Sequence, residues 1–251
     1  MRSCLARATC LALALALALA LLAGPAKSGD LAGDLADFNA AVEQAQSHNR
    51  VAIGYLRTGN LDLALLEIDR LRDAWSAFEQ RFAGKRPDAF DGIALYGTVF
   101  TGVQARLVAV DLMIKMGNPD AVRQSLEAIR GDLYDLRKAA GIKVLADCVR
   151  DGNAAMDALM VYDDRALDWT KSETRDGIAS KASIYGSVLE RCDGMASEPV
   201  RATPEFRRLV DGAKASLALI QKAISTRDGD LLHRVLIELR SFDNLLAFRF
   251  G

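Results

Sequence analysis

The stretch GNLDLALLEIDRLRDAW, residues 59–75, is a short turn followed by a run whose apolar residues recur every three or four positions. Two later stretches follow the same plan: GNPDAVRQSLEAIRGDL from residue 117 and GDLLHRVLIELRSFDNL from residue 229. This spacing places the apolar side chains on one face of a helix. Each Gly-Asn or Gly-Asp pair is therefore predicted to mark the corner of a helical hairpin, and the helix after it needs a neighbour to cover its apolar face.

The same period extends along most of the chain, and strand-like alternation does not. One predicted stripe precedes the first corner, and a stripe with the same steps of four and three precedes the last corner. These two stripes are Phe38, Val42, Ala45, Asn49, Ala52 and Leu56, and Phe206, Val210, Ala213, Leu217, Ile220 and Ile224. The stripes after the three corners begin Leu61, Ala64 and Ile68; Val122, Leu126 and Ile129; and Leu232, Val235 and Leu239.

The predicted fold class is all-α, with antiparallel helical hairpins that form two modules resembling four-helix bundles, at residues 31–140 and 141–251. A single larger helical array is the alternative. Only Gly141 separates the fourth predicted helix from the fifth, at about 144–164, so these two are either separate or one long bent helix. The similar phase of the first and last hairpins leaves open whether the halves arose by duplication.

The first residues have the pattern of a secretory signal peptide. MRSCLARATC is a short basic segment, LALALALALALLAG is an apolar run, and PAKSGD supplies small residues for cleavage after Ala26 or Ser28. The apolar run spans residues 11–24, shorter than the about 20 residues that a membrane span needs. The sequence therefore predicts export to the periplasm without a stable membrane span after cleavage; an uncleaved anchor helix is the alternative.

Charge excludes some classes of partner. Cleavage after Ala26 would remove two of the 32 basic residues and leave 33 acidic ones, for a mature net charge of about −3. Nucleic acids and anionic lipids attract strongly basic surfaces. We therefore expect no nucleic-acid partner, and the partners that remain are a protein or a small ligand.

Four cysteines are present, and two of them, Cys4 and Cys10, belong to the predicted signal peptide. Cys148 falls near the start of one predicted helix and Cys192 near the end of the next, so the two are side by side in an antiparallel hairpin. In an oxidising compartment such a pair forms a disulfide. The alternative is a pair of thiolates that bind a soft metal such as copper(I).

Methionine and histidine supply the weak candidates for a metal or heme site. Met156 and Met160 are four residues apart on one predicted helix, and Met also fills gaps in cores. The two histidines are His48 and His233, and solvent is the expected neighbour of His233. Beside His48, Asn49 interrupts an apolar stripe, which indicates either a residue that fixes helix register or a binding pocket in the first bundle.

Acidic residues gather after the fifth predicted helix, at Asp163, Asp164, Asp168, Glu173 and Asp176. They suit either a hard cation or a solvated helix end. The sequence has no phosphate-binding glycine loop, His-Glu-x-x-His, nucleophile elbow or Cys-x-x-Cys-His. No catalytic residues and no cofactor are therefore predicted.

The export signal, the helix lengths and the Gly-Asn or Gly-Asp corners resemble those of the class II, or c-prime, cytochromes and their heme-free relatives. The resemblance implies a four-helix-bundle fold. Where such proteins attach heme near the end of the last helix, this chain has DAWSAFEQRFAG or NLLAFRFG, with neither cysteine nor histidine. Covalently attached heme, which the cytochromes of this class contain, is therefore not expected in this chain.

Together these patterns predict an exported, periplasmic, all-helical binding or accessory protein that is not an enzyme. The alternative function is a carrier of copper or heme with a site inside a helical bundle.

Overall fold

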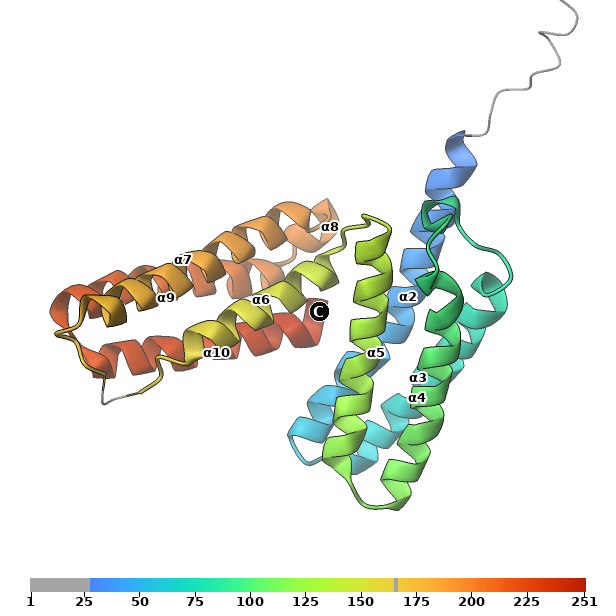
Figure 1. Ribbon diagram of the computed structural model, residues 1–251, viewed down its shortest axis with the longest axis horizontal. Coiled ribbons are helices and arrows are strands. Elements are labelled where there is room, and N and C mark those ends of the chain that lie inside the picture. Colours follow the sequence, from blue (N-terminus) through green and yellow to red (C-terminus); the bar gives the residue numbers. More distant parts are fainter. Residues whose placement is uncertain (1–27, 165–166) are drawn as a thin grey trace, which may run out of the picture.

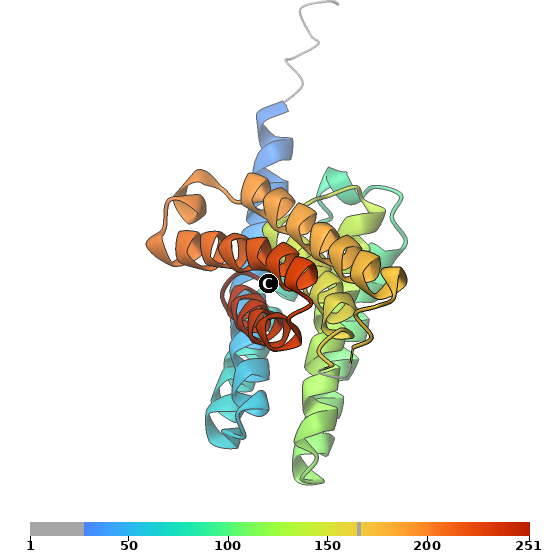
Figure 2. The same ribbon diagram turned by 90° about the vertical axis from the view of Figure 1, so that its left-hand side faces the viewer.

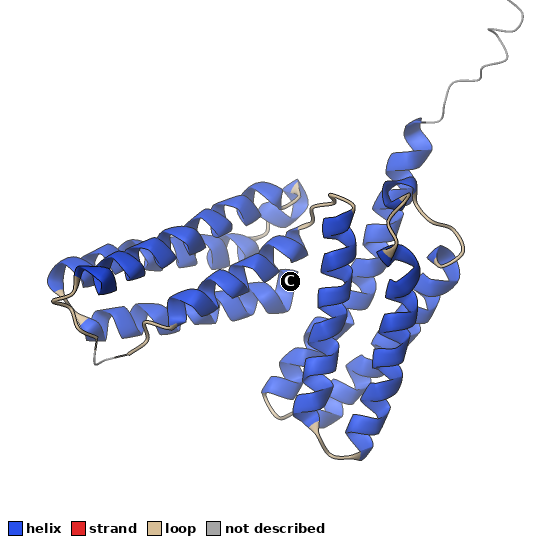
Figure 3. Cartoon of the chain, viewed as in Figure 1, coloured by secondary structure: helices blue, strands red, loops and turns tan. Residues whose placement is uncertain are grey.

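A computed structural model describes residues 28–164 and 167–251, so the predicted signal peptide lies outside the described residues. The described chain is all-α and contains no strand (Figure 3). Four long helices form the first bundle: α2 (Ser28–Arg57), α3 (Leu61–Phe82), α4 (Leu95–Lys115) and α5 (Pro119–Ala139). Four more form the second bundle: α6 (Leu145–Met160), α7 (Ser172–Met195), α9 (Pro204–Thr226) and α10 (Gly229–Phe250). The prediction of an all-α fold is confirmed.

The corners form as the sequence predicts, with one exception. Asn60 and Asn118 each cap the following helix by accepting a hydrogen bond from a backbone N–H three residues on. Gly59 and Gly117 precede them with φ of 75° and 65°, a conformation that glycine adopts without steric cost. At the third corner the left-handed residue is Arg227, with φ of 54°, because Gly229 already belongs to α10.

The predicted apolar stripes form two separate hydrophobic clusters. The first cluster holds buried residues from Phe38 to Leu136, and the second holds residues from Val149 to Ala247. Within the first stripe even the polar Asn49 is fully buried. Leu61 is an exception to the predicted pattern, since it is 40% exposed at the first position of α3, where the chain has only just left its turn.

Several predicted boundaries need correction. The fourth and fifth predicted helices are separate, because α5 ends at Ala139 and Gly141 takes φ of 69° before α6 begins at Leu145. Helix α6 ends at Met160 and does not extend to residue 164. The sequence pattern also missed two short helices, η1 (Asp88–Phe90) and α8 (Glu198–Arg201).

Helix α4 is the one helix in the described part of the chain that is long and apolar enough to cross a membrane. One of its faces packs in the first hydrophobic cluster through Tyr96, Phe100 and Val103. Its outer face exposes Val108 and Leu112. Core helices of bundles also meet this test of length and composition.

The two bundles run in different directions and meet along a seam. Figure 1 shows α5 facing α6 and the end of α10 close to the first bundle, and Figure 2 views the second bundle nearly end-on. Helix α10 contacts α2 across this seam. A Cβ on Gly54 would come within 2.8 Å of the Phe248 ring, so the absence of a side chain at Gly54 permits this close approach.

Candidate functional site

A cavity of about 290 Å³ lies in the seam, and both bundles contribute to its walls. The first bundle supplies residues of α2 and α5, and the second supplies the start of α6, one residue of α8 and the end of α10. The lining residues are Asn39, Val42, Glu43, Gln46, Arg130, Arg137, Val144, Leu145, Ala146, Asp147, Arg150, Val200, Arg249, Phe250 and Gly251. We call this space the interbundle cavity.

Two arginines beside the cavity are held by carboxylates of the same chain. Arg50, which is 6% exposed, donates to both oxygens of Glu43, at 2.5 and 3.2 Å. Arg137, 5% exposed, donates from Nε to Asp147 at 2.7 Å and from Nη2 to the other oxygen of the same carboxylate. Such two-point pairs fix the planar guanidinium group, so these two arginines have a structural role, Arg137 in the cavity wall and Arg50 behind Glu43.

The Arg137–Asp147 pair joins α5 to α6 across the seam. Arg50 makes a further contact of this kind, because its Nη1 donates to the main-chain oxygen of Gly251 at 2.8 Å. The two paired arginines therefore also fix the position of one bundle against the other.

Arg130 and Arg150 differ from the paired arginines. Nη2 of Arg130 and Nη1 of Arg150 are buried and have no hydrogen-bond partner in the described chain. Arg150 lies over the Tyr134 ring, with its Cζ 4.3 Å from the ring centre, which stabilises the cation but leaves its N–H groups available. Nine buried side-chain atoms of the described chain lack a partner, Nε of Arg50 among them. Buried polar groups are nearly always hydrogen-bonded, so the donors of Arg130 and Arg150, which have no carboxylate partner either, need an explanation.

The pKa of Arg130 is consistent with its lack of a carboxylate partner. Burial, together with the positive charges of Arg50 and Arg150, lowers the pKa of Arg130 to about 10. Arg130 is still positively charged at neutral pH, but its charge is less stable in the folded protein than in water. An anion in the cavity would reverse this effect.

Two amide side chains add hydrogen-bonding capacity to the same wall. Nε2 of Gln46 and Oδ1 of Asn39 are buried and have no partner among the described residues. Asn49 holds Gln46 in place, since its Nδ2 donates to Oε1 of Gln46 at 3.2 Å and to the main-chain oxygen of Leu126 at 3.0 Å. Asn49 thus links α2 to α5 inside the first bundle and also supports a residue of the cavity wall.

The candidate metal ligands of the sequence are not brought to one site. His48 pairs with Glu67 at 2.7 Å in the first bundle, and Met156 and Met160 pack in the second hydrophobic cluster. Among the described residues no group of three or more His, Cys, Asp or Glu is arranged to hold a metal ion. His233, for which solvent is the expected neighbour, has a side chain that is 31% exposed, and it also has a partner that the sequence did not predict: its Nδ1 lies 2.5 Å from Oδ1 of Asp163, which the loop after α6 brings alongside α10.

Of the acidic residues after α6, Glu173 and Asp176 lie at the start of α7, whereas Asp163, Asp164 and Asp168 are not on a helix. Asp163 binds His233, and Asp168 accepts hydrogen bonds from the backbone N–H and the hydroxyl of Thr170. These hydrogen bonds are the largest of the effects that lower the pKa of Asp168. Since α6 ends at Met160, Asp164 and Asp168 do not share a helix face.

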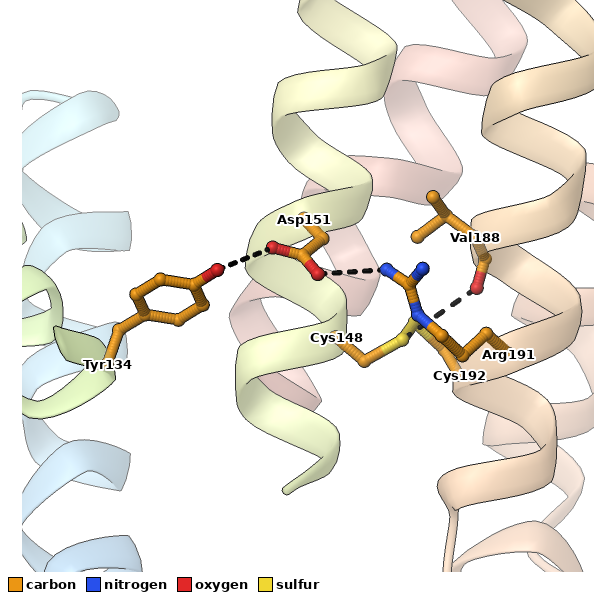
Figure 4. Close-up of a disulfide and its surroundings, with 6 residues drawn as sticks. All are labelled: Tyr134, Cys148, Asp151, Val188, Arg191 and Cys192. Carbon is orange, nitrogen blue, oxygen red and sulfur yellow. Dashed lines mark hydrogen bonds and ion pairs between the residues drawn. A yellow bond between two sulfur atoms is a disulfide. The ribbon is translucent and has the colours of Figure 1, made fainter. Parts of the chain in front are cut away.

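Cys148 and Cys192 form a disulfide that joins α6 to α7, with the Cα atoms 5.5 Å apart (Figure 4). The predicted pairing is therefore present in the structure. Asp151, one turn further along α6, accepts hydrogen bonds from Tyr134 of α5 at 3.2 Å and from Arg191 of α7 at 2.8 Å. The disulfide and Asp151 together hold the part of α6 that carries Arg150.

Sequence reasoning missed the arginines of the seam, although they share a pattern. Arg50, Arg130, Arg137 and Arg150 each directly follow a buried residue of their helix. Arg130 and Arg137 are also one heptad apart on α5, so they lie on the same side of that helix. Arginines repeated beside an apolar stripe are the signal that could have indicated a second, polar contact face.

Comparison with protein-family models, with curated proteins and with solved structures gave no match. The resemblance to the c-prime cytochromes thus stays a prediction. The fold and the candidate site define an all-α protein of two helical bundles with a cationic cavity between them.

Proposed function

We propose that this chain is an exported, periplasmic binding protein, not an enzyme, and that its ligand occupies the interbundle cavity. The observation that carries the proposal is the pair of buried, unpaired guanidinium donors at Arg130 and Arg150. Leaving a buried charged donor without a partner costs several kcal/mol in a typical protein, and a ligand that supplies the partner removes this cost.

The size and composition of the cavity support a small-molecule ligand. Its volume of about 290 Å³ is close to the lower end of ligand pockets, which span about 300–1,000 Å³. Its walls combine aliphatic side chains such as Val42 and Leu145 with charged and amide groups. Binding sites commonly have this mixture, in which apolar surface provides affinity and a few polar groups provide orientation.

The location between two bundles also supports binding. Ligand sites occur preferentially where two packed units meet, because neither unit alone can surround the ligand. Here α2 and α5 supply Gln46 and Arg130, and α6 supplies Arg150. A ligand in the cavity would contact both bundles and stabilise their arrangement.

The proposal of export rests on the N-terminal sequence and on the disulfide, which suits an oxidising compartment. Expression of the full chain in a cell with a periplasm, followed by N-terminal sequencing, tests it. We expect a mature N-terminus at Lys27 or Gly29 in the periplasmic fraction. An unprocessed chain in the cytoplasm contradicts this part of the proposal.

Native mass spectrometry of the protein isolated from its own host tests the binding function. We expect a bound small molecule in the wild-type protein, and we expect Ala146→Trp to lose it because the indole would fill the cavity. The matched control is Val161→Trp, at a position that is 70% exposed and does not line the cavity. An equal amount of ligand in wild type and Ala146→Trp, or none in either, contradicts the proposal.

A further inference from the structure

We infer that the ligand of the interbundle cavity is a compact organic dianion, such as a short dicarboxylate or a small organic phosphate. The inference rests on the proposed function and adds the chemical class of the ligand. It depends on the charge balance of the cavity, on the directions from which its donors come, and on its apolar lining.

The two side-chain carboxylates that line the cavity are already neutralised, and the main-chain oxygen of Gly251, which also lines it, is held by Arg50. Glu43 binds Arg50 and Asp147 binds Arg137, each through two hydrogen bonds. Neither carboxylate therefore has a charge to spare for a cationic ligand. This excludes a cation as the preferred occupant.

The remaining charged side chains at the cavity are positive. Arg249 pairs with Glu205 at 2.8 Å, which leaves Arg130 and Arg150 without a carboxylate partner in the described chain. Two guanidinium groups without a carboxylate partner favour a ligand with two anionic groups. A single anion would leave one buried charge unbalanced.

Glu127 is the carboxylate that acts on Arg130. It raises the pKa of Arg130, but burial and the neighbouring arginines Arg50 and Arg150 lower it by more. Glu127 is held by Arg57 and by Arg123, each at 3.1 Å. The negative charge of Glu127 is thus shared with these two arginines, and Glu127 does not neutralise Arg130.

The unused donors converge from three helices. Gln46 of α2, Arg130 of α5 and Arg150 of α6 each line the cavity, and each has a buried N–H group without a partner in the described residues. Guanidinium groups present paired N–H donors that match the oxygens of a carboxylate or phosphate. Two such groups from opposite bundles suit a molecule with an anionic group at each end or one doubly charged phosphate.

The rest of the lining favours an organic body over a bare inorganic ion. Val42, Val144, Leu145, Val200 and Phe250 contribute aliphatic and aromatic surface. Inorganic phosphate is strongly hydrated and gains nothing from such surface. A ligand with a short carbon chain between or beside its charges would bury that chain there.

Calorimetric titration of the mature protein with a matched set of probes tests the inference. The probes are succinate and glycerol 3-phosphate as organic dianions, inorganic phosphate, and succinamide as the neutral analogue, all at equal ionic strength. We expect at least one organic dianion to bind at least tenfold more tightly than both inorganic phosphate and succinamide. Added sodium chloride should weaken the binding, because chloride screens the two arginines.

Substitutions test the assigned residues. Arg130→Met and Arg150→Met should each weaken dianion binding at least tenfold, and Arg130→Lys, which keeps the charge but not the planar group, should lie between them and wild type. Arg72→Met is the control, because Arg72 binds Asp69 and Asp111 away from the cavity. If Arg130→Met does not fold, Arg130→Lys and Arg150→Met still decide the outcome.

Three results overturn the inference: no organic dianion binds better than succinamide, inorganic phosphate binds as tightly as both organic dianions, or the arginine variants bind as wild type does. Failure of this inference is distinguishable from failure of the proposed function. A neutral ligand that the wild-type protein retains and Ala146→Trp loses leaves the proposed function standing and refutes only the dianion. Dianion binding that Ala146→Trp leaves unchanged refutes the cavity as the site.

Discussion

Arg130 of α5 and Arg150 of α6 belong to different bundles, line one cavity, and each have a buried N–H group without a partner in the described chain. The neighbouring Arg137 lines the same cavity but is bound by Asp147. Arg137 thus holds the two bundles together, whereas Arg130 and Arg150 are assigned to ligand binding.

The contrast predicts opposite effects on stability. Without ligand, Arg130→Met should leave the free energy of unfolding unchanged or raise it by up to about 1 kcal/mol, because it removes an unpaired and partly buried charge. Arg137→Met should lower it by about 3 kcal/mol, because it leaves the buried Asp147 carboxylate without its partner. Urea denaturation of both variants at neutral pH measures this. A large loss of stability in Arg130→Met would mean that Arg130 has a structural role.

The disulfide predicts a redox-dependent stability. It closes a loop between residues 44 positions apart, and the chain-entropy relation gives about 4 kcal/mol for such a loop, less any strain. Unfolding of the wild-type protein with and without dithiothreitol measures the difference. The variant with both Cys148→Ala and Cys192→Ala is the control and should not respond to the reductant. Equal stability of oxidised and reduced wild type would contradict the prediction.

Asp243 predicts a pH dependence of stability. Burial raises its pKa from 3.8 to about 6, although Asn153 and Arg240 act in the opposite direction. Between these values the folded protein binds more protons than the unfolded chain, so this residue makes stability fall as pH rises from about 4 to 6. The pKa difference corresponds to about 3 kcal/mol at neutral pH.

Asp243→Asn should therefore reduce the loss of stability between pH 4 and pH 7 by about 2 kcal/mol, since part of the effect is already present at pH 4; urea denaturation at both values measures this. Asp69→Asn is the control, because Asp69 also binds an arginine, Arg72, but its side chain is 70% exposed and it is not among the groups that shift the pKa of Asp243. That control should change the pH dependence by less than about 0.5 kcal/mol. An Asp243→Asn variant that keeps the wild-type pH dependence would show that Asp243 does not titrate in this range.

The left-handed conformation of Arg227 predicts that glycine at this position stabilises the protein. It is exposed and adopts φ of 54° at the end of α9, where glycine is the residue without a steric cost. Arg227→Gly should raise the free energy of unfolding by about 0.5–1 kcal/mol, after the greater freedom of glycine in the unfolded chain is subtracted. Glycine at the helical neighbour Thr226 should lower stability instead, and thermal unfolding compares the two. A decrease for Arg227→Gly would argue against the left-handed corner.

Much of the fold could be predicted from the sequence because its determinants are local. The stripe from Phe38 to Leu56 is buried as its spacing predicts, and Asn60 and Asn118 cap their helices. The Cys148–Cys192 pair also follows from position along two antiparallel helices. Each of these features depends on one helix or one hairpin.

The candidate site could not be predicted in the same way. Periodicity shows which face of a helix enters its own bundle, but it does not show which remaining face meets the other bundle. The role of these arginines becomes visible only once the second bundle is placed against the first, which brings the start of α6 to α5 (Figure 1). The pairing of His233 with Asp163 is a similar case, because it joins residues 70 positions apart through a loop.

The most direct test of the central claim is a crystal structure of the protein isolated from its own host. The account predicts density for a small molecule in the interbundle cavity, within hydrogen-bonding distance of Arg130 Nη2 and Arg150 Nη1. An empty or solvent-filled cavity, or the same two arginines bound to carboxylates of the chain itself, would contradict it.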